Sequence, residues 1–244
     1  MNLLHWGHKP VQFYQGLMIK ADLGLHAQIA QMLRRELPGG GLVLDLGAGE
    51  GALCARLADL GYRMVAADKK ADDFKCSRAA FECLDFDRPK EIEAFVAANE
   101  GRFDAVLGIE VIEHVQDPWQ YARRLLRMAR PGGLVLVTTP NTTSWLSRLQ
   151  FLFTGRFHQF GPADLRYGHI NPMTPYELEQ VLSAAGAHEL RVTPAGTLPP
   201  LYLSGIDRVT AFSLLALLLR PFMRGAVLDG WCVMATGRKP IRDA

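Results

Sequence analysis

Short apolar runs alternate with longer segments of helical periodicity along most of the chain. A short apolar run is typical of a buried strand, whereas apolar positions that recur every three or four residues are typical of an amphipathic helix. The alternation therefore predicts strand–helix repeats. The expected strands are 42–46, a run that ends at Asp68, 80–84, 103–109 and 134–138, and the expected helices between them are 52–60, 89–99 and 118–129.

This order of elements predicts an α/β fold in which a doubly wound, mainly parallel, Rossmann-like sheet carries helices on both faces. We expect residues 1–40 to form an N-terminal helical cap, because residues 22–37 show helical spacing before a Pro-Gly-Gly-Gly loop. The main domain is expected at 41–244, with a lid insertion at about 141–174 and an apolar helix at about 207–223. In such sheets, ligands bind at the carboxyl ends of the strands.

Composition narrows the class of protein only slightly. A net charge of +2 over 244 residues, without a dense basic tract, argues against an extended nucleic-acid surface but leaves open a local pocket for an RNA end. The four cysteines lack CxxC spacing, which favours reduced structural thiols in a cytoplasmic protein. The amino terminus shows no basic patch followed by a continuous apolar stretch, so we expect no secretory signal.

The apolar run at 209–223 has two interpretations. It is shorter than the roughly 20 residues that a membrane-spanning helix needs, so we expect no transmembrane span. Arginines flank it at 208, 220 and 224, which would suit peripheral contact of 207–224 with the inner face of the membrane, or a cover over a hydrophobic acceptor site. The alternative is a buried helix packed on the sheet, which we favour.

The most informative motif is a glycine-rich turn after the first strand. Gly47, Gly49 and Gly51 follow the strand, Asp45 precedes them, and Asp68 ends the next strand. Glycines let the backbone approach a ligand closely, and an acidic residue at this distance suits ribose hydroxyls. The motif therefore predicts a nucleoside-cofactor site, although any tight turn between a strand and a helix favours glycine.

The spacing of the glycines separates two cofactor classes. The turn reads GxGxG rather than the GxGxxG of dinucleotide sites, and the acidic Asp45 suits a cofactor that carries an ammonium and a sulfonium. Together with Asp85-Phe86, FDAVLGIEVIEHV at 103–115 and RPGGLVLVTTPN at 130–141, the turn resembles the class I S-adenosylmethionine-dependent methyltransferases, over roughly 41–186. The matching subgroup is the ubiquinone type, which contains the EVIEH sequence.

The resemblance implies a seven-stranded sheet with an antiparallel last strand, formed here by the runs at 188–192 and 231–236. It also implies roles for several residues. The three glycines would line the methionine part of the cofactor, and Asp45 belongs to the same site. Asp85 with Phe86 would hold the adenine, and Ile109 with Glu110 would lie beneath the sulfonium end.

Glu110, Glu113 and His114 form the most ambiguous group. In the superfamily such residues form the loop after the fourth strand, with the histidine near the acceptor. The sequence also resembles two groups, the ubiquinone-type O-methyltransferases and the small-RNA 3′-terminal 2′-O-methyltransferases, in which two glutamates and the adjacent histidine bind a divalent metal. The RNA group adds a second histidine, for which this chain offers His169. We favour the metal-free interpretation, with His114 as base or orienter, Glu113 positioning it and His169 across the acceptor pocket. The alternative for His169 is a structural role, in which it packs at the start of the next helix.

The resemblance therefore predicts an S-adenosylmethionine-dependent methyltransferase. Aromatic side chains at 145–160 and the run at 209–223 favour O-methylation of a hydrophobic or lipid- or glycan-linked small molecule. Three alternatives stay open: a metal-assisted 2′-O-methyltransferase acting on an RNA 3′ end, a degenerate regulatory protein that binds the cofactor, and an NAD-linked oxidoreductase. The sequence does not identify the acceptor.

Overall fold

The centre of the molecule is a seven-stranded sheet in the order β6-β5-β4-β7-β8-β11-β9. The computed structural model describes residues 4–5, 11–197, 201–202, 208–225 and 227–241. The first five strands of this order are parallel, whereas β11 runs antiparallel to both β8 and β9. The doubly wound sheet with an antiparallel last strand is confirmed. Its strands are β4 (Leu42–Leu46), β5 (Arg63–Asp68), β6 (Ala79–Cys83), β7 (Phe103–Ile109), β8 (Ala129–Pro140), β9 (His188–Ala195) and β11 (Cys232–Arg238).

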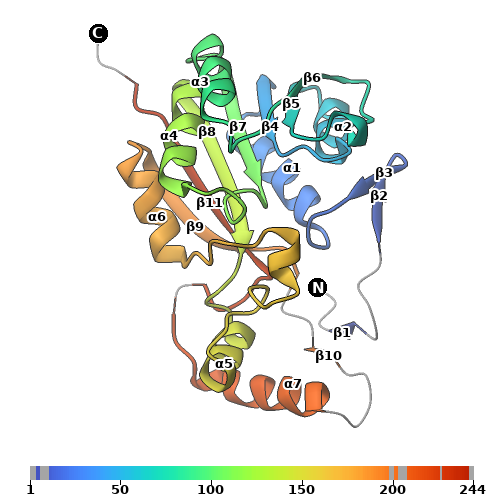
Figure 1. Cartoon of the computed structure of the whole chain (residues 1–244), viewed down its shortest axis with the longest axis vertical. Helices are drawn as coiled ribbons and strands as arrows, with labels where there is room; N and C mark the ends of the chain where they lie inside the picture. The colour runs from blue at the N-terminus through green and yellow to red at the C-terminus, as the bar shows by residue number, and fades with distance from the viewer. Residues whose placement is uncertain (1–3, 6–10, 198–200, 203–207, 226, 242–244) are drawn as a thin grey trace.

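Helices cover both faces of the sheet, and each face has its own apolar core (Figure 1). Alternate residues of β4 show this arrangement, because Leu44 and Leu46 pack into one core and Val43 into the other. A strand buried on both faces explains why these segments read as continuous apolar runs. One face carries α1 (Leu25–Glu36) and α2 (Ala52–Asp59), and the other carries α3 (Pro89–Ala98), α4 (Pro118–Met128) and α6 (Pro175–Ala184).

Capping side chains set the start of α4 and α6. Asp117 accepts a hydrogen bond from the backbone N–H of Gln120, which satisfies one of the unpaired donors at the start of α4. The predicted cap Thr174 forms a reciprocal capping box with Glu177 at the start of α6. A proline occupies the first turn of both helices, where its missing N–H costs nothing.

Strand β8 is longer than the sequence predicted. We expected the chain from 130 to 133 to be a loop, but β8 already begins at Ala129 and runs to Pro140. The pairing register with β7 shifts between Phe103 and Ala105, which accommodates the irregular Pro-Gly-Gly segment. A Cβ atom on Gly133 would lie 3.0 Å from the carbonyl oxygen of Phe103. The glycine therefore allows the two strands to approach closely. The Pro-Gly-Gly sequence, which indicates a loop by local preference, is here part of a strand.

The N-terminal region contains a β-hairpin in addition to helix α1. Strands β2 (Gln12–Tyr14) and β3 (Leu17–Ile19) pair antiparallel around Gln15 and Gly16, which both have positive φ. Two such residues form the tight turn that hairpins prefer. The expected helical cap at 1–40 is thus only partly helical in the described residues. A further short pair joins β1 (Leu4–His5) to β10 (Leu201–Tyr202).

The segment 141–174, which the sequence predicts to be a lid and which we call the lid, lies with the apolar C-terminal segment beyond the carboxyl ends of the strands (Figure 1). Helix α7 (Arg208–Leu219) contacts α5 (Trp145–Thr154) and is not packed on the sheet, contrary to the alternative that we favoured. The short 3₁₀ turns η1 (Ala71–Asp73), η2 (Asp164–Tyr167) and η3 (Arg220–Phe222) complete the described elements. Residue 207, the expected start of the apolar helix, lies outside the described residues. Within the described part of the chain, every helix is too short or too polar to reach across a bilayer.

Candidate active site

A cavity of about 530 Å³ lies at the carboxyl ends of the central parallel strands. It gathers residues from the glycine turn, from the ends of β5 and β7, and from the lid. Eleven of the twelve residues that the sequence singled out line it. They are Asp45, Gly47, Gly49, Asp68, Asp85, Phe86, Ile109, Glu110, Glu113, His114 and His169.

The glycine turn is held in a conformation that larger residues adopt only with strain. Gly47 has a φ of +82°, and a Cβ atom there would clash with the Cγ2 methyl of Val111. Gly49 also has a positive φ, and its N–H donates a hydrogen bond of 2.9 Å to the Oδ2 atom of Asp68. The turn is therefore coupled directly to the end of β5.

Gly51, the twelfth residue, does not line the cavity. It precedes α2 with a φ of +85°, and a Cβ atom on it would clash with Cys76 and with the ring of Phe74. Glycine is required here because of backbone conformation and close packing. The structure thus gives Gly51 a packing role and places only Gly47 and Gly49 at the cavity.

Asp68 and Asp85 are two half-buried carboxylates at the rim of the cavity. Asp68 accepts hydrogen bonds from the backbone N–H groups of Gly49, at 2.9 Å, and Lys70, at 3.1 Å, one on each oxygen. Asp85 accepts one from the N–H of Asp87 at 3.1 Å. A carboxylate oxygen can accept more than one hydrogen bond, so Asp68 retains capacity for two hydroxyl donors.

Asp45 lies on β4 in the cavity wall and is almost fully buried. Its carboxylate accepts a hydrogen bond from the thiol of Cys54, at 3.4 Å. Burial raises the pKa of Asp45 to about 7, and the hydrogen bond from Cys54 offsets this only in part. Asp45 is consequently a poor anion in the free protein, and a cationic ligand group beside it would favour its ionised form.

We expect Asp45→Asn to remove a pH-dependent loss of stability. The folded-state pKa of about 7 exceeds the ordinary value of 3.8, so the contribution of Asp45 to stability is lost as pH rises from about 4 to about 7. Relative to the wild type, the free variant should gain up to about 4 kcal/mol in unfolding free energy between the ends of this range. Urea unfolding of both proteins at pH 4 and pH 8 measures the two unfolding free energies. A difference between variant and wild type that is the same at both pH values would contradict the raised pKa of Asp45.

Glu110 begins the loop after β7 in a strained backbone conformation. Its φ is +54°, which is unusual for a residue with a side chain. Its Oε1 atom accepts a 2.8 Å hydrogen bond from the hydroxyl of Thr138, and its Oε2 atom lies 3.3 Å from the Sγ atom of Cys232, which donates to it. These contacts from β8 and β11 fix the carboxylate at the floor of the cavity.

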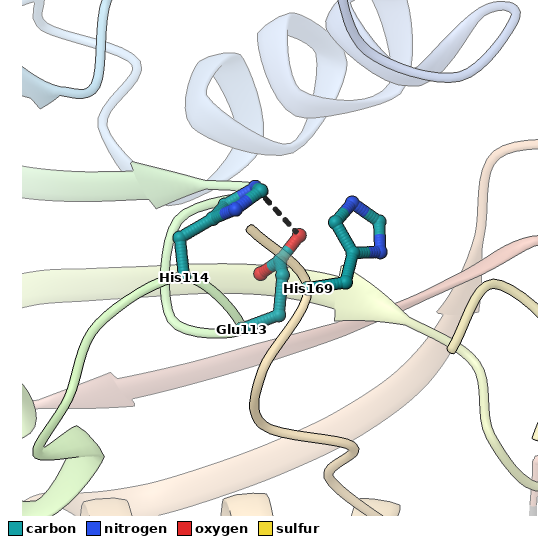
Figure 2. Close-up of side chains that lie close together, drawn as sticks. All are labelled: Glu113, His114 and His169. Atoms are coloured by element: carbon teal, nitrogen blue, oxygen red, sulfur yellow. Dashed lines mark ion pairs between the residues drawn. The ribbon is translucent and has the colours of Figure 1, made fainter. Parts of the chain in front are cut away.

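Glu113, His114 and His169 form a cluster at the other end of the cavity. Figure 2 shows the Glu113 carboxylate between the two imidazoles, with the His114 Nε2 atom 3.9 Å from Glu113 Oε1. Glu113 is fully buried, and among the described residues no hydrogen bond of ordinary geometry reaches either of its carboxylate oxygens. Burial, and then the neighbouring Glu110, raise the pKa of Glu113 well above its ordinary value. The site therefore contains a buried acid that requires a proton, a cation or a donor.

Backbone contacts bring His169 to this cluster from the lid. The N–H groups of Ile170 and Asn171 both donate to the backbone carbonyl of Glu113, at 3.0 Å. The ring of His169 lies edge-on to that of His114, with centroids 4.9 Å apart. The structure thus brings His114 and His169 into ring contact, closer than the sequence-based expectation that His169 lies across the acceptor pocket.

The tautomer of His169 follows from its hydrogen bond. Its Nδ1 atom lies 2.9 Å from the backbone carbonyl of Gln159. A carbonyl only accepts, so Nδ1 carries the hydrogen and Nε2 has a free lone pair when the ring is neutral. Burial, and then His169, lower the pKa of His114 below its ordinary value. His114 can therefore be neutral at physiological pH, and the hydrogen bond of His169 Nδ1 leaves the Nε2 atom of that ring as the candidate proton acceptor.

Sequence reasoning missed several residues of the cavity. Lys20 and His26 come from the N-terminal region, Gln159 from the lid, and Cys54 and Cys232 bond to the acidic residues described above. None of them belongs to a motif. Gln159 has a positive φ of +67°, which marks a special backbone position in the structure, but a glutamine in the sequence does not indicate such a position.

Comparison with known proteins identifies the fold. A family model described as a methyltransferase domain matches residues 21–190. A solved S-adenosylmethionine-dependent methyltransferase from Archaeoglobus fulgidus has a TM-score of 0.58 and 19% sequence identity, covering 88% of this chain and 94% of that one. At such identity the likeness shows the fold alone.

Curated relatives match over a shorter region. The ubiquinone biosynthesis O-methyltransferase of Caulobacter vibrioides is 39% identical over 104 residues, which are 41% of each chain. The enzyme of the same name from Chelativorans sp. is 33% identical over 147 residues, 59% of this chain and 57% of that one. The matches thus span less than two thirds of the length of these relatives.

Proposed function

Because the chain belongs to the class I S-adenosylmethionine-dependent methyltransferases, we propose that it transfers the methyl group of S-adenosylmethionine to a hydroxyl oxygen of a hydrophobic small molecule. One observation supports this most strongly. A single cavity joins the glycine turn and Asp68 at one end to a buried carboxyl and two imidazoles at the other. Such a cavity can hold a nucleoside cofactor and an acceptor side by side.

The cavity residues fit the chemistry of the cofactor. Asp68 has acceptor capacity for the two ribose hydroxyls, and Asp85 at the end of the neighbouring strand can accept from the adenine amino group. Asp45 and Glu110 supply negative charge near the glycine turn, where an ammonium and a sulfonium would lie. Gly47 and Gly49 leave room for close approach.

The proposed mechanism needs alignment and one proton acceptor. When bound, S-adenosylmethionine supplies a methyl group already activated on a positive sulfur. The lid residues exclude water from the acceptor end, and the cavity walls hold the acceptor hydroxyl in line. His169 Nε2, with its lone pair free, takes the hydroxyl proton. The Glu113 carboxyl, which has an oxygen within 4.8 Å of a His169 ring nitrogen, stabilises the resulting imidazolium when it is ionised.

A metal-assisted mechanism is the second candidate. Glu113, His114 and His169 each offer one ligand atom, and these atoms lie within 4.8 Å of one another. Among the described residues, this group excludes Glu110, whose carboxylate bonds to Thr138 and Cys232 instead. One carboxylate and two imidazoles suit Mn²⁺, Fe²⁺ or Zn²⁺ better than Mg²⁺. Such an ion would lower the pKa of the acceptor hydroxyl.

The acceptor class rests on the relatives and on an apolar face beside the site. The curated relatives are named as O-methyltransferases of ubiquinone biosynthesis, and they do not support RNA 3′-end methylation or a degenerate regulatory role. Helices α5 and α7 with η3 expose a set of large apolar side chains, which we term the α5–α7 face. Its members are Phe151, Leu152, Phe153, Leu214, Leu215, Leu217, Leu218 and Phe222.

The charge around the α5–α7 face suits an anionic membrane surface. The segments 141–163 and 208–228 contain no Asp or Glu and five arginines. Arg156 and Arg224 are exposed, whereas Arg220 pairs with Asp229 at 2.6 Å. An apolar patch with a cationic rim is the pattern of a peripheral membrane contact. We therefore propose that the α5–α7 face rests on the membrane and that the acceptor is lipid-linked.

We expect the double variant Leu152→Glu/Leu218→Glu to lose binding to vesicles that contain anionic lipid. Both leucines are exposed, at 75% and 69%, and two charges at the lipid boundary oppose burial in it. The loss should be at least about tenfold in vesicle affinity, since each lost apolar contact is worth roughly 1.5–3 kcal/mol. Cosedimentation measures it. Ile241→Glu, at a position 71% exposed but away from this face, serves as control, and equal binding by all three proteins would refute the membrane contact.

Two measurements test the proposed reaction. Calorimetric titration with S-adenosylhomocysteine tests the cofactor site, and the absence of binding would refute it. Transfer of a labelled methyl group to a phenol with a long alkyl tail, compared with the same phenol without the tail, tests the acceptor class. Faster methylation of the tailed phenol in vesicles is expected, and a preference for the short phenol would contradict a lipid-linked acceptor.

A further inference from the structure

The hairpin β2–β3 lies over the glycine turn, although the methyltransferase family model matches only from residue 21 onward. Met18 and Lys20, at and just after β3, line the cavity. The Cδ atom of Lys20 is 3.8 Å from the position that a Cβ atom on Gly49 would take. The alkyl chain of this lysine therefore covers the turn, at the end of the cavity where the methionine part of the cofactor would lie.

Hydrogen bonds anchor the hairpin β2–β3 both to the glycine turn and to the end of α2. The N–H of Met18 donates a 3.0 Å hydrogen bond to Glu50, which directly follows Gly49. At the other end, Tyr14 and Gln15 donate to the carboxylate of Asp59, at the end of α2. These contacts hold Lys20 in place over the turn without using its ammonium group.

The ammonium group of Lys20 is a positive charge on a side chain that lies over the glycine turn and lines the cavity. The cationic residues that line the cavity in the described structure are Lys20, Lys69 and Lys70. Lys69 and Lys70 directly follow Asp68 and belong to the ribose end. Lys20 Nζ lies 3.2 Å from Asp73, but both side chains are about half exposed, at 54% and 41%. Such an ion pair is worth little and can exchange for another anion.

A second side chain from the N-terminal region that lines the cavity has a ring nitrogen without a hydrogen bond among the described residues. His26 on α1 lines the cavity, and its buried Nδ1 atom makes no hydrogen bond. Burial, and then Arg56, lower the pKa of His26 to about 4, so the ring is neutral at physiological pH. A neutral imidazole can donate one hydrogen bond. The N-terminal region thus supplies the cavity with a cation and with an unsatisfied polar atom.

We propose that Lys20 exchanges its ion pair with Asp73 for the α-carboxylate of the cofactor, so that the hairpin β2–β3 acts as a clasp over the methionine part. This inference rests on the proposed function, because it assumes S-adenosylmethionine in the cavity. It assigns the recognition of the carboxylate to a segment outside the matched methyltransferase domain, with His26 as the second donor.

The test compares two ligands that differ in the amino-acid part. S-adenosylhomocysteine carries the carboxylate, whereas 5′-methylthioadenosine lacks the amino-acid group entirely. We expect Lys20→Gln to weaken S-adenosylhomocysteine binding about tenfold, as for loss of a charge-assisted hydrogen bond. The same variant should bind 5′-methylthioadenosine like the wild type. Calorimetry with both ligands gives the two ratios.

Two further variants test whether the loss of binding comes from the contact between Lys20 and the carboxylate or from a general loss of positive charge. Asp73→Asn should bind S-adenosylhomocysteine at least as tightly as the wild type, because it frees Lys20 from its competing partner. Lys90→Gln, on the exposed surface of α3, removes the same charge away from the cavity and should change neither ligand. Equal weakening of both ligands by Lys20→Gln, or parallel weakening by Asp73→Asn, would overturn the proposal. If the wild type bound neither ligand, the proposed function would fail instead.

Discussion

Asp68→Ala is expected to weaken binding of S-adenosylhomocysteine by at least about 100-fold, because two hydrogen bonds to a charged acceptor are each worth roughly 1.5–3 kcal/mol. The side chain lies at the rim of the cavity, and its oxygens already accept from the N–H groups of Gly49 and Lys70. Those contacts fix the carboxylate before ligand binding, so little order must be gained when the ribose hydroxyls arrive. Isothermal calorimetry measures the loss directly.

The same contacts demand a control for folding. Asp68 also holds the glycine turn, so part of the loss in Asp68→Ala can come from a displaced turn. Asp68→Asn keeps the shape and one acceptor oxygen, and it should lie between the wild type and the alanine variant. Asp72→Ala, at an exposed position of η1 outside the cavity, should bind normally. Tight binding by Asp68→Ala, with an unchanged melting temperature, would remove Asp68 from the site.

His169→Asn is expected to lower kcat by about 1000-fold, within the range that a positioned general base contributes. The asparagine amide can still donate to the carbonyl of Gln159, as His169 Nδ1 does, but it offers no basic nitrogen in place of Nε2. Affinity for S-adenosylhomocysteine should stay within about twofold, because the lost group faces the acceptor and not the cofactor. Single-turnover methyl transfer, with calorimetry in parallel, separates the two effects.

This variant also distinguishes the two mechanisms. If His169 is the base, added Mn²⁺ should not restore the activity that its replacement removes. If the cluster binds a metal, metal-stripped wild type should be inactive, and Glu113→Gln should weaken metal binding measured by calorimetry. His188→Asn, on the exposed surface of β9, is the matched control. Full activity of His169→Asn would contradict both roles for this residue.

The sequence interpretation of His114 needs the same test. Sequence favoured His114 as the base, and the structure adds His169 as a second candidate, because a carbonyl fixes its tautomer. His114 instead faces Glu113 at 3.9 Å and lies against the ring of His169. Which imidazole accepts the proton remains a prediction for the paired variants His114→Asn and His169→Asn.

The sequence by itself determined the sheet and the cofactor half of the site. Strands buried on both faces read as apolar runs, and the parallel order brings their carboxyl ends to one edge. Asp45, Gly47 and Asp68 lie in or directly beside these local patterns, so their placement followed from backbone periodicity alone. The Pro-Gly-Gly segment of β8 was misjudged, because a register shift with β7 allows a strand where local preference indicates a loop.

Only the tertiary structure decided the acceptor half and the contacts of the cavity. His169 reaches Glu113 through backbone hydrogen bonds of the lid, and Lys20 reaches the glycine turn through a hairpin anchored on α2. The position of α7 against α5 was equally undetermined, since an apolar run reads the same whether it packs on a sheet or faces outward. Local patterns fix which backbone conformation a segment prefers, whereas contacts between distant segments depend on how the whole chain packs.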